Sequence, residues 1–134
     1  MSVQVKKTTL SSAQILALHA TPINILPAPA SGYVNCILGI GQDMTYNSIV
    51  YGGGGVLYYG LTNNNTNWAF YDSSGVLLST YNINMPAARV DSSSVPLSPF
   101  PTTKDFFVGS GATTPTNGNS SIDIYVVYEV KPIQ

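Results

Sequence analysis

The feature that most constrains the fold is a two-residue alternation near the C-terminus. Every even-numbered residue from 122 to 130 is Ile, Val or Tyr, whereas the odd-numbered positions between them include Asp123 and Glu129. Successive side chains of a β-strand point to opposite faces, so this period places the apolar set on one face. The segment 122–130 therefore predicts a strand that turns one side toward a core.

Other short segments rich in β-branched and aromatic residues also predict strands, and glycine, proline or asparagine separates them. They span residues 3–10, 22–26, 33–40, 48–51, 56–61, 68–71, 76–79 and 105–108, and one edge strand is expected near 88–90. Residues 68–71 and 76–79 flank an Asp-Ser-Ser-Gly sequence, which is typical of a hairpin. Prolines between 81 and 104 predict mostly irregular structure there.

The helical signal is confined to a short segment near the N-terminus. Ser11 stands three residues before Gln14, which is the spacing of a capping box, and Pro22 requires the helix to end near His19 or Ala20. Short strands without α/β alternation predict an all-β chain: an antiparallel β-sandwich, jelly-roll-like, with one short N-terminal helix. We expect residues 1–10 to form an extended N-terminal arm or an edge strand, and residues 11–134 to form a single β-sandwich domain.

Charge is scarce in this chain. Charged residues make up only 8% of its 134 residues, against about 25% in a typical domain. Soluble monomers usually avoid association through interspersed charges, whereas here Ser, Thr, Asn and Gly must cover much of the surface. Such a surface suits a particle-bound protein that contacts other subunits. A monomer with a polar, uncharged surface is the alternative.

The distribution of charged and apolar residues argues against several classes of protein. Lysines and arginines are scattered, with no cluster longer than Lys6-Lys7, so no nucleic acid is expected as a partner. No run of about 18 apolar residues could span a membrane, and no apolar segment follows the first residues as in a secretory signal. Cys36 is the single cysteine, so no disulfide framework is expected.

Residues that carry chemistry are few and dispersed. His19 is the single histidine, Cys36 lies within an apolar run, and the six carboxylates are spread along the chain, mostly near turns or strand edges. No serine stands in a Gly-x-Ser-x-Gly pattern, and the glycine run 52–55 lacks the lysine of a phosphate-binding loop. We therefore expect no catalytic residue, no metal site and no cofactor, and a protein that is not an enzyme.

Two groups of residues are candidates for binding. Aromatic residues on the expected central strands are suited to a subunit interface or to stacking on sugar rings, and burial in a β core is the alternative. They are Tyr58, Tyr59, Trp68, Phe70 and Tyr71. The second group, in the N-terminal arm, is the candidate for binding a capsid or a neighbouring subunit. Its members are Val3, Val5, Lys6 and Lys7.

Three segments together resemble small virion proteins of tailed phages, the capsid decoration and head-fibre type of subunit. The first, residues 10–22 continuing through 25–32, is similar to a short capped helix, a strand entry and a Pro-Ala-Pro turn into the first core strand. The second, residues 49–53, is similar to a Tyr-Gly element that follows that strand. The third, residues 114–119, resembles a Gly/Asn loop that leads into a closing strand.

This resemblance implies a β-rich structural subunit that decorates or cements the capsid or forms part of a head fibre. The implied partners are further copies in a homotrimer, together with the major capsid protein or other virion proteins. The resemblance also implies that the chain is made in the host cytoplasm. The resemblance supplies no catalytic residues. A carbohydrate-binding module, free or at a fibre tip, that uses the exposed aromatics is the alternative function.

Overall fold

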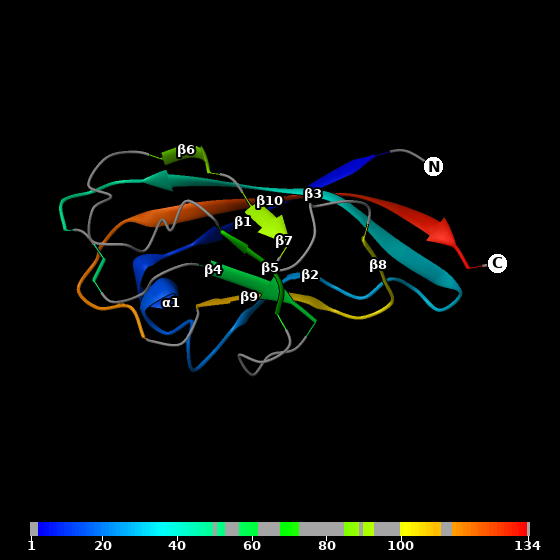
Figure 1. Ribbon diagram of the computed structural model, residues 1–134, viewed down its shortest axis with the longest axis horizontal. Helices are drawn as coiled ribbons and strands as arrows, with labels where there is room; N and C mark the ends of the chain where they lie inside the picture. The colour runs from blue at the N-terminus through cyan, green and yellow to red at the C-terminus, as the bar shows by residue number, and fades with distance from the viewer. Residues whose placement is uncertain are drawn as a thin grey trace.

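The computed structural model describes residues 3–49, 51–52, 57–61, 68–72, 85–88, 90–92, 100–110 and 114–133. For the strand segments between 68 and 100, only the backbone is described. Figure 1 shows the strands arranged in two layers. The expected all-β, antiparallel sandwich is confirmed, because every strand pair is antiparallel and a common core lies between the two sheets.

Among the described residues, each sheet contains five strands. The first sheet has the order β1 (Gln4–Leu10), β10 (Ser121–Pro132), β3 (Tyr33–Thr45) and β6 (Met85–Ala88), and β8 (Phe100–Thr102) also pairs with β3. The second sheet has the order β2 (Ile23–Leu26), β9 (Phe106–Ser110), β4 (Leu57–Gly60), β5 (Trp68–Asp72) and β7 (Val90–Ser92). The chain crosses repeatedly from one sheet to the other. This crossing between sheets favours jelly-roll connectivity, which stays a prediction.

The segment 122–130 with its two-residue period lies within β10, in the interior of the first sheet. β10 pairs with β1 on one side and with β3 on the other. Ile122, Ile124 and Val126 are fully buried, as the alternation predicts. The register between β10 and β3 shifts at Val127/Tyr128, where Leu38 is the extra residue of a β-bulge.

The core lies between the sheets and receives buried side chains from both of them. From the first sheet they include Leu10, Ile37, Ile40 and Met44, and from the second Ile25, Leu57, Phe106 and Val108. Gln42 of β3 and Tyr59 of β4 are also fully buried, and the Tyr59 hydroxyl donates a hydrogen bond to Gln42 Oε1. A polar contact therefore joins the two sheets inside the core.

Helix α1 (Ser12–Leu16) connects β1 to β2. The capping box expected from Ser11 and Gln14 is present, since each side chain bonds the backbone N–H of the other. The helix ends earlier than predicted, and a turn over residues 17–20 follows in which the Thr21 N–H donates to the Ala17 carbonyl. Among the described residues, no helix is long and apolar enough to cross a membrane.

The prediction of a strand over 48–51 is wrong. Ser48, Ile49 and Tyr51 are not in a strand, because the backbone N–H groups of Ser48 and Ile49 donate to the Asn119 side chain instead of to a neighbouring strand. β3 continues five residues beyond the predicted end at Ile40. The expected hairpin partner, residues 76–79, lies outside the described residues.

The proline-rich stretch 81–104 contains more strand than predicted. Its described residues include three short strands, and two of them contain a proline: Pro86 in β6 and Pro101 in β8. Both strands pair with β3 on the side away from β10. Proline is tolerated on an edge strand because its missing N–H can face away from the ladder.

Candidate functional site

Several of the described residues that could support catalysis have structural contacts or are buried. Among the described residues, no three of His, Cys, Asp and Glu come together to hold a metal ion. Asp105 Oδ1 accepts a hydrogen bond from the Ala28 N–H at 2.7 Å, and Glu129 lies 3.7 Å from Lys131. Cys36 is a buried free thiol. These side chains have structural contacts, and they do not converge on a common centre.

The five candidate aromatics do not form one exposed set. Tyr59 is fully buried, and its ring stacks near Phe106 with 6.3 Å between the ring centroids. Tyr59 is therefore a core residue, which corrects its assignment as a glycan-contact candidate. Tyr58 is half-buried and lies opposite Tyr71 in the β4–β5 register. Because neighbouring residues of a strand face opposite sides, the register position shared by Tyr58 and Tyr71 is on the outer face.

Trp68 and Phe70 also belong to β5. Their Cα partners on β4 are Gly60 and Tyr59. The side chains of Trp68, Phe70 and Tyr71 lie outside the described part of the structure. The register therefore assigns Tyr58 and Tyr71 to a common outer position, next to Gly109 of β9. The Gly60–Trp68 position lies on the same face, because Gly60 is two residues after Tyr58 on β4.

The candidate arm residues lie in or beside β1, which pairs with β10 along its whole length. Lys6 is half-buried on the core side of the strand, whereas Val3 and Val5 alternate on the outer side and are 55% and 61% exposed. Lys7 shares the outer side with the two valines. The candidate arm is thus an edge strand whose outer side is apolar at its beginning.

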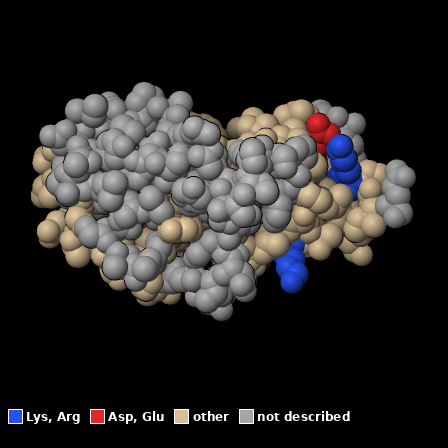
Figure 2. Space-filling model, viewed as in Figure 1, with Lys and Arg blue, Asp and Glu red and all other residues tan. Residues whose placement is uncertain are grey.

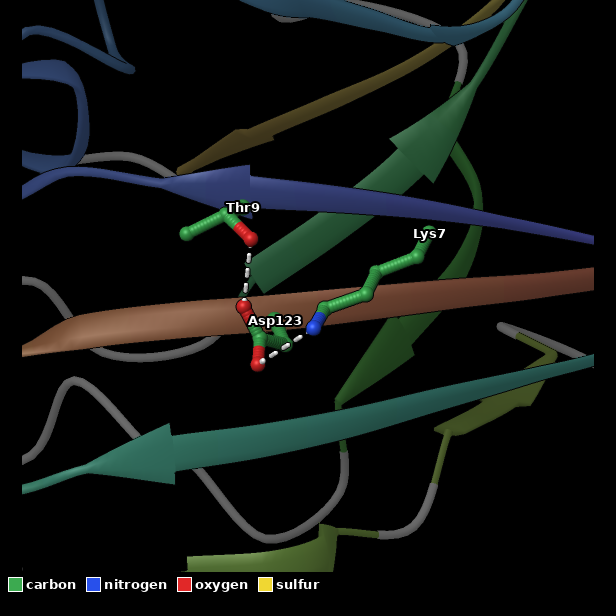
Figure 3. A network of polar contacts seen from close by, with 3 residues as sticks. All are labelled: Lys7, Thr9 and Asp123. Atoms are coloured by element: carbon green, nitrogen blue, oxygen red, sulfur yellow. Dashed lines mark hydrogen bonds and ion pairs between the residues drawn. The ribbon is translucent and has the colours of Figure 1, made fainter.

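A polar network fixes the middle of β1 to β10 (Figure 3). The Thr9 hydroxyl donates a hydrogen bond to Asp123 Oδ1 at 2.6 Å, and Lys7 Nζ lies 3.6 Å from Asp123 Oδ2. Lys7 Nζ also lies 6.0 Å from the centre of the Tyr125 ring, within cation–π range. Lys7 therefore holds two strands of this chain together, which sequence reasoning did not anticipate.

Exposed large apolar side chains gather at one end of the first sheet. They are Val3, Val5, Tyr33 and Ile133, and we call them the apolar end. Figure 1 shows both chain termini and the beginning of β3 at this end, where the first sheet extends past the second. Pro132 pairs with Tyr33, and the Ile133 N–H donates to the Gly32 carbonyl at 2.9 Å, so the outermost backbone is ordered by hydrogen bonds.

Charged residues lie beside the apolar end, since Lys6 and Lys7 are in β1, and Glu129 and Lys131 are in the last part of β10. Figure 2 shows mostly uncharged described residues on this face of the molecule, and the coloured charged side chains lie toward the end with the termini. Among the described residues, the remaining exposed large apolar side chain is Ile49, in the loop after β3. Figure 1 places that loop at the opposite end of the sandwich.

Two of the segments that carry the phage resemblance lie side by side at this opposite end. Gly52 and Thr116 exchange backbone hydrogen bonds of 2.8 Å, and Asn119 binds the backbone of Ser48 and Ile49. The Tyr51 ring is buried against Gly118, and its hydroxyl donates to the Ser120 carbonyl. We call residues 46–49, 51–52 and 114–120 the loop clamp.

The loop clamp gives the turn residues of these segments a structural role. Burial of the Tyr51 hydroxyl raises its pKa to about 12, because a phenolate there would lose hydration. The sequence signals of this contact are Tyr51 before Gly52 and Asn119 after Gly118. Only the tertiary fold brings these two pairs of residues together. The clamp stabilises the end of the sandwich through these contacts.

No protein-family model, no curated protein and no solved structure matches the chain. Its candidate function therefore rests on the surface features described above.

Proposed function

We propose that this chain is a structural subunit of a tailed-phage particle, which decorates or cements the capsid or forms part of a head fibre. The observation that carries the proposal is the apolar end, because it exposes valine, tyrosine and isoleucine side chains on a chain with few charges. The resemblance of the terminal segments supplies the phage setting. Contacts with further copies and with capsid proteins would cover the exposed apolar surface.

The driving force for such a contact is burial of apolar area. Burial contributes about 25 cal/mol per Å², and stable interfaces bury about 1,600 Å² in total. Association also costs translational and rotational freedom, so only part of that gain appears as affinity. Val3 and Val5, on the outer side of β1, supply the apolar centre of such a contact, whereas Tyr33 pairs with Pro132 and belongs to the other face of the sheet. The Ser-, Thr- and Asn-rich surface supplies the polar rim.

The first test of this proposal measures self-association by light scattering over a dilution series. We expect a mass above 14.2 kDa, and the trimer implied by the resemblance predicts three times that value. The double variant Val3→Ser/Val5→Ser should lower the mass, whereas Ile49→Ser, an exposed apolar change at the opposite end, should leave it unchanged. A persistent monomer would contradict the subunit proposal.

The second test concerns the phage setting. Antibodies against the purified protein should label the capsid surface or the fibres of intact tailed-phage particles in electron micrographs, and a pre-adsorbed serum is the control. Absence of labelling on particles whose genome encodes the chain would refute the virion assignment.

A carbohydrate-binding module is the second candidate function, and the facing positions of Tyr58 and Tyr71 favour it. Two aromatics on one outer face can stack against a sugar ring. Saturable binding on a glycan array that is lost in Tyr58→Ala and in Trp68→Ala, with unchanged circular dichroism, would support this function. Retention of binding in both variants would exclude these aromatics as the glycan contact.

A further inference from the structure

The outer edge of β1 is a surface for strand pairing. Among the described strands, β1 pairs with β10 alone, and it ends the order of the first sheet. In an antiparallel ladder, alternate residues direct their N–H and C=O groups away from the paired neighbour. Such an edge can accept another strand through main-chain hydrogen bonds.

The accessible part of this edge is the N-terminal half of β1. Exposure alternates along the strand: Val3, Val5, Lys7 and Thr9 on the outer side are exposed, whereas Leu10 on the core side is fully buried. Figure 1 shows α1 beside the Leu10 end, while the other end of β1 extends away from the helix. An added strand therefore has most room along residues 3–7.

The lysines restrict how a second copy of β1 can pair. Two identical antiparallel strands pair about a twofold axis, and alignment of the whole of β1 would place Lys7 directly opposite Lys7 of the second copy. An axis at Lys6 would oppose the two Lys6 side chains. Like charges directly opposite one another are destabilising. These longer alignments are therefore disfavoured, as expected for lysines on an edge strand.

A twofold axis at Val5 removes these oppositions. Val5 then lies opposite Val5 of the second copy, Gln4 lies opposite Lys6, and Val3 lies opposite Lys7. This is the longest alignment of residues 3–7 that places no lysine opposite another lysine. An axis at Gln4 pairs fewer of these residues.

We propose that two copies of this chain join through the N-terminal halves of β1, antiparallel and about a twofold axis at Val5, so that the first sheet continues from one copy into the other. Val127 is the β10 partner of Val5. The joined sheet thus carries a row of four valines across four adjacent strands: Val127 and Val5 of each copy. Cross-strand apolar pairs of this kind stabilise sheets.

This pairing deepens the proposed function, since it names the partner of the apolar end. It differs from the implied trimer because a twofold contact joins copies in pairs. The two ideas therefore predict different masses and different cross-links.

Single-cysteine variants test the alignment. In a Cys36→Ser background, Val5→Cys should form a covalent dimer in a glutathione redox buffer, because the two residues at position 5 face each other. Lys7→Cys is the matched control on the same side of the strand. The two cysteines at position 7, one from each copy, would be four residues apart along the strands, or roughly 13 Å, which is too far for a disulfide. Equal or stronger cross-linking of Lys7→Cys, or none for Val5→Cys, would overturn the proposal.

Light scattering on a second pair of variants separates the pairing from the broader function. Val5→Lys places two lysines on the twofold axis and should weaken dimerisation roughly tenfold or more, whereas Val5→Thr keeps a β-branched side chain and should retain the dimer. A trimer that both variants leave intact, without Val5→Cys cross-linking, would refute the pairing and leave the subunit proposal standing. A cross-linked dimer that does not label phage particles would refute the virion role and support the pairing.

Discussion

Replacement of Gly118 by alanine tests whether the loop clamp depends on direct contact between a glycine and an aromatic ring. A Cβ at position 118 would overlap ring carbons of the buried Tyr51 side chain. The ring cannot move freely, because the Tyr51 hydroxyl is bonded to the Ser120 carbonyl. Relief of the overlap therefore requires a shift of the loop or loss of that hydrogen bond.

The expected cost combines two effects. Overpacking of a filled site costs about 1–3 kcal/mol, and loss of the hydrogen bond adds about 0.5–1.5 kcal/mol. We expect Gly118→Ala to lower the free energy of unfolding by about 2–4 kcal/mol, which corresponds to a fall in Tm on the order of 10 °C for a domain of this size. Urea titration followed by tryptophan fluorescence or circular dichroism measures the change.

Gly39→Ala is the matched control. A Cβ at Gly39 would meet no atom within 4 Å, so the same chemical change should alter stability by less than about 1 kcal/mol. In a Tyr51→Ala background the ring is absent, and Gly118→Ala should then cost little. An undiminished cost in that background, or a cost in the wild type no larger than that of Gly39→Ala, would refute the reasoning.

Three further predictions concern the loop clamp and the polar contact in the core. Asn119→Ala should cost about 1–3 kcal/mol in urea titration, because two backbone N–H groups lose their acceptor, whereas Asn119→Asp should cost less; equal costs would contradict the acceptor role. Tyr51 ionises near pH 10 in the unfolded state and near pH 12 in the folded state, so the free energy of unfolding is retained below pH 10 and falls as the pH rises toward 12. Relative to Tyr51→Phe, the wild type should lose about 1.3 kcal/mol of stability between pH 9 and 11. A stability difference between the two proteins that does not change with pH would disprove this. Tyr59→Phe should cost about 1–3 kcal/mol by leaving Gln42 Oε1 unpaired, while Tyr59→Phe/Gln42→Met should recover most of that stability; a double variant less stable than Tyr59→Phe would argue against it.

Local patterns predicted the elements whose determinants are local. The alternation in 122–130 predicted β10 and its buried face, and the spacing of Ser11 and Gln14 predicted the capping box. In both cases the residues that decide the structure stand within a few positions of one another. The antiparallel sandwich also followed from the number and length of such segments.

Elements that depend on distant partners could not be predicted in the same way. Ser48 and Ile49 lack a strand because Asn119, about 70 positions away, takes their N–H groups. The sequence around Tyr58 and Tyr59 indicates a strand, but a shift of one residue exchanges its two faces. Only the register with neighbouring strands shows that Tyr59 belongs to the core and Tyr58 to the other face.

The same limit applies to the candidate surface. Val3, Val5, Tyr33 and Ile133 are distant in sequence, and pairing among β1, β10 and β3 brings their segments to one end of the sheet. Lys7 was expected to bind a partner, yet it already contacts Asp123 within the chain.

The bulge at Leu38 gives this protein a simple way to change the direction of its interaction surface. It lies between the part of β3 that pairs with β8 and the part that pairs with β6. A bulge bends its strand and increases the local twist. Deletion of Leu38 would preserve every pairing between β3 and β10 while straightening the strand. Loss or gain of a single codon could thus rotate the apolar end relative to the sandwich, and related assemblies of different curvature could arise without any change in the residues that form the contact.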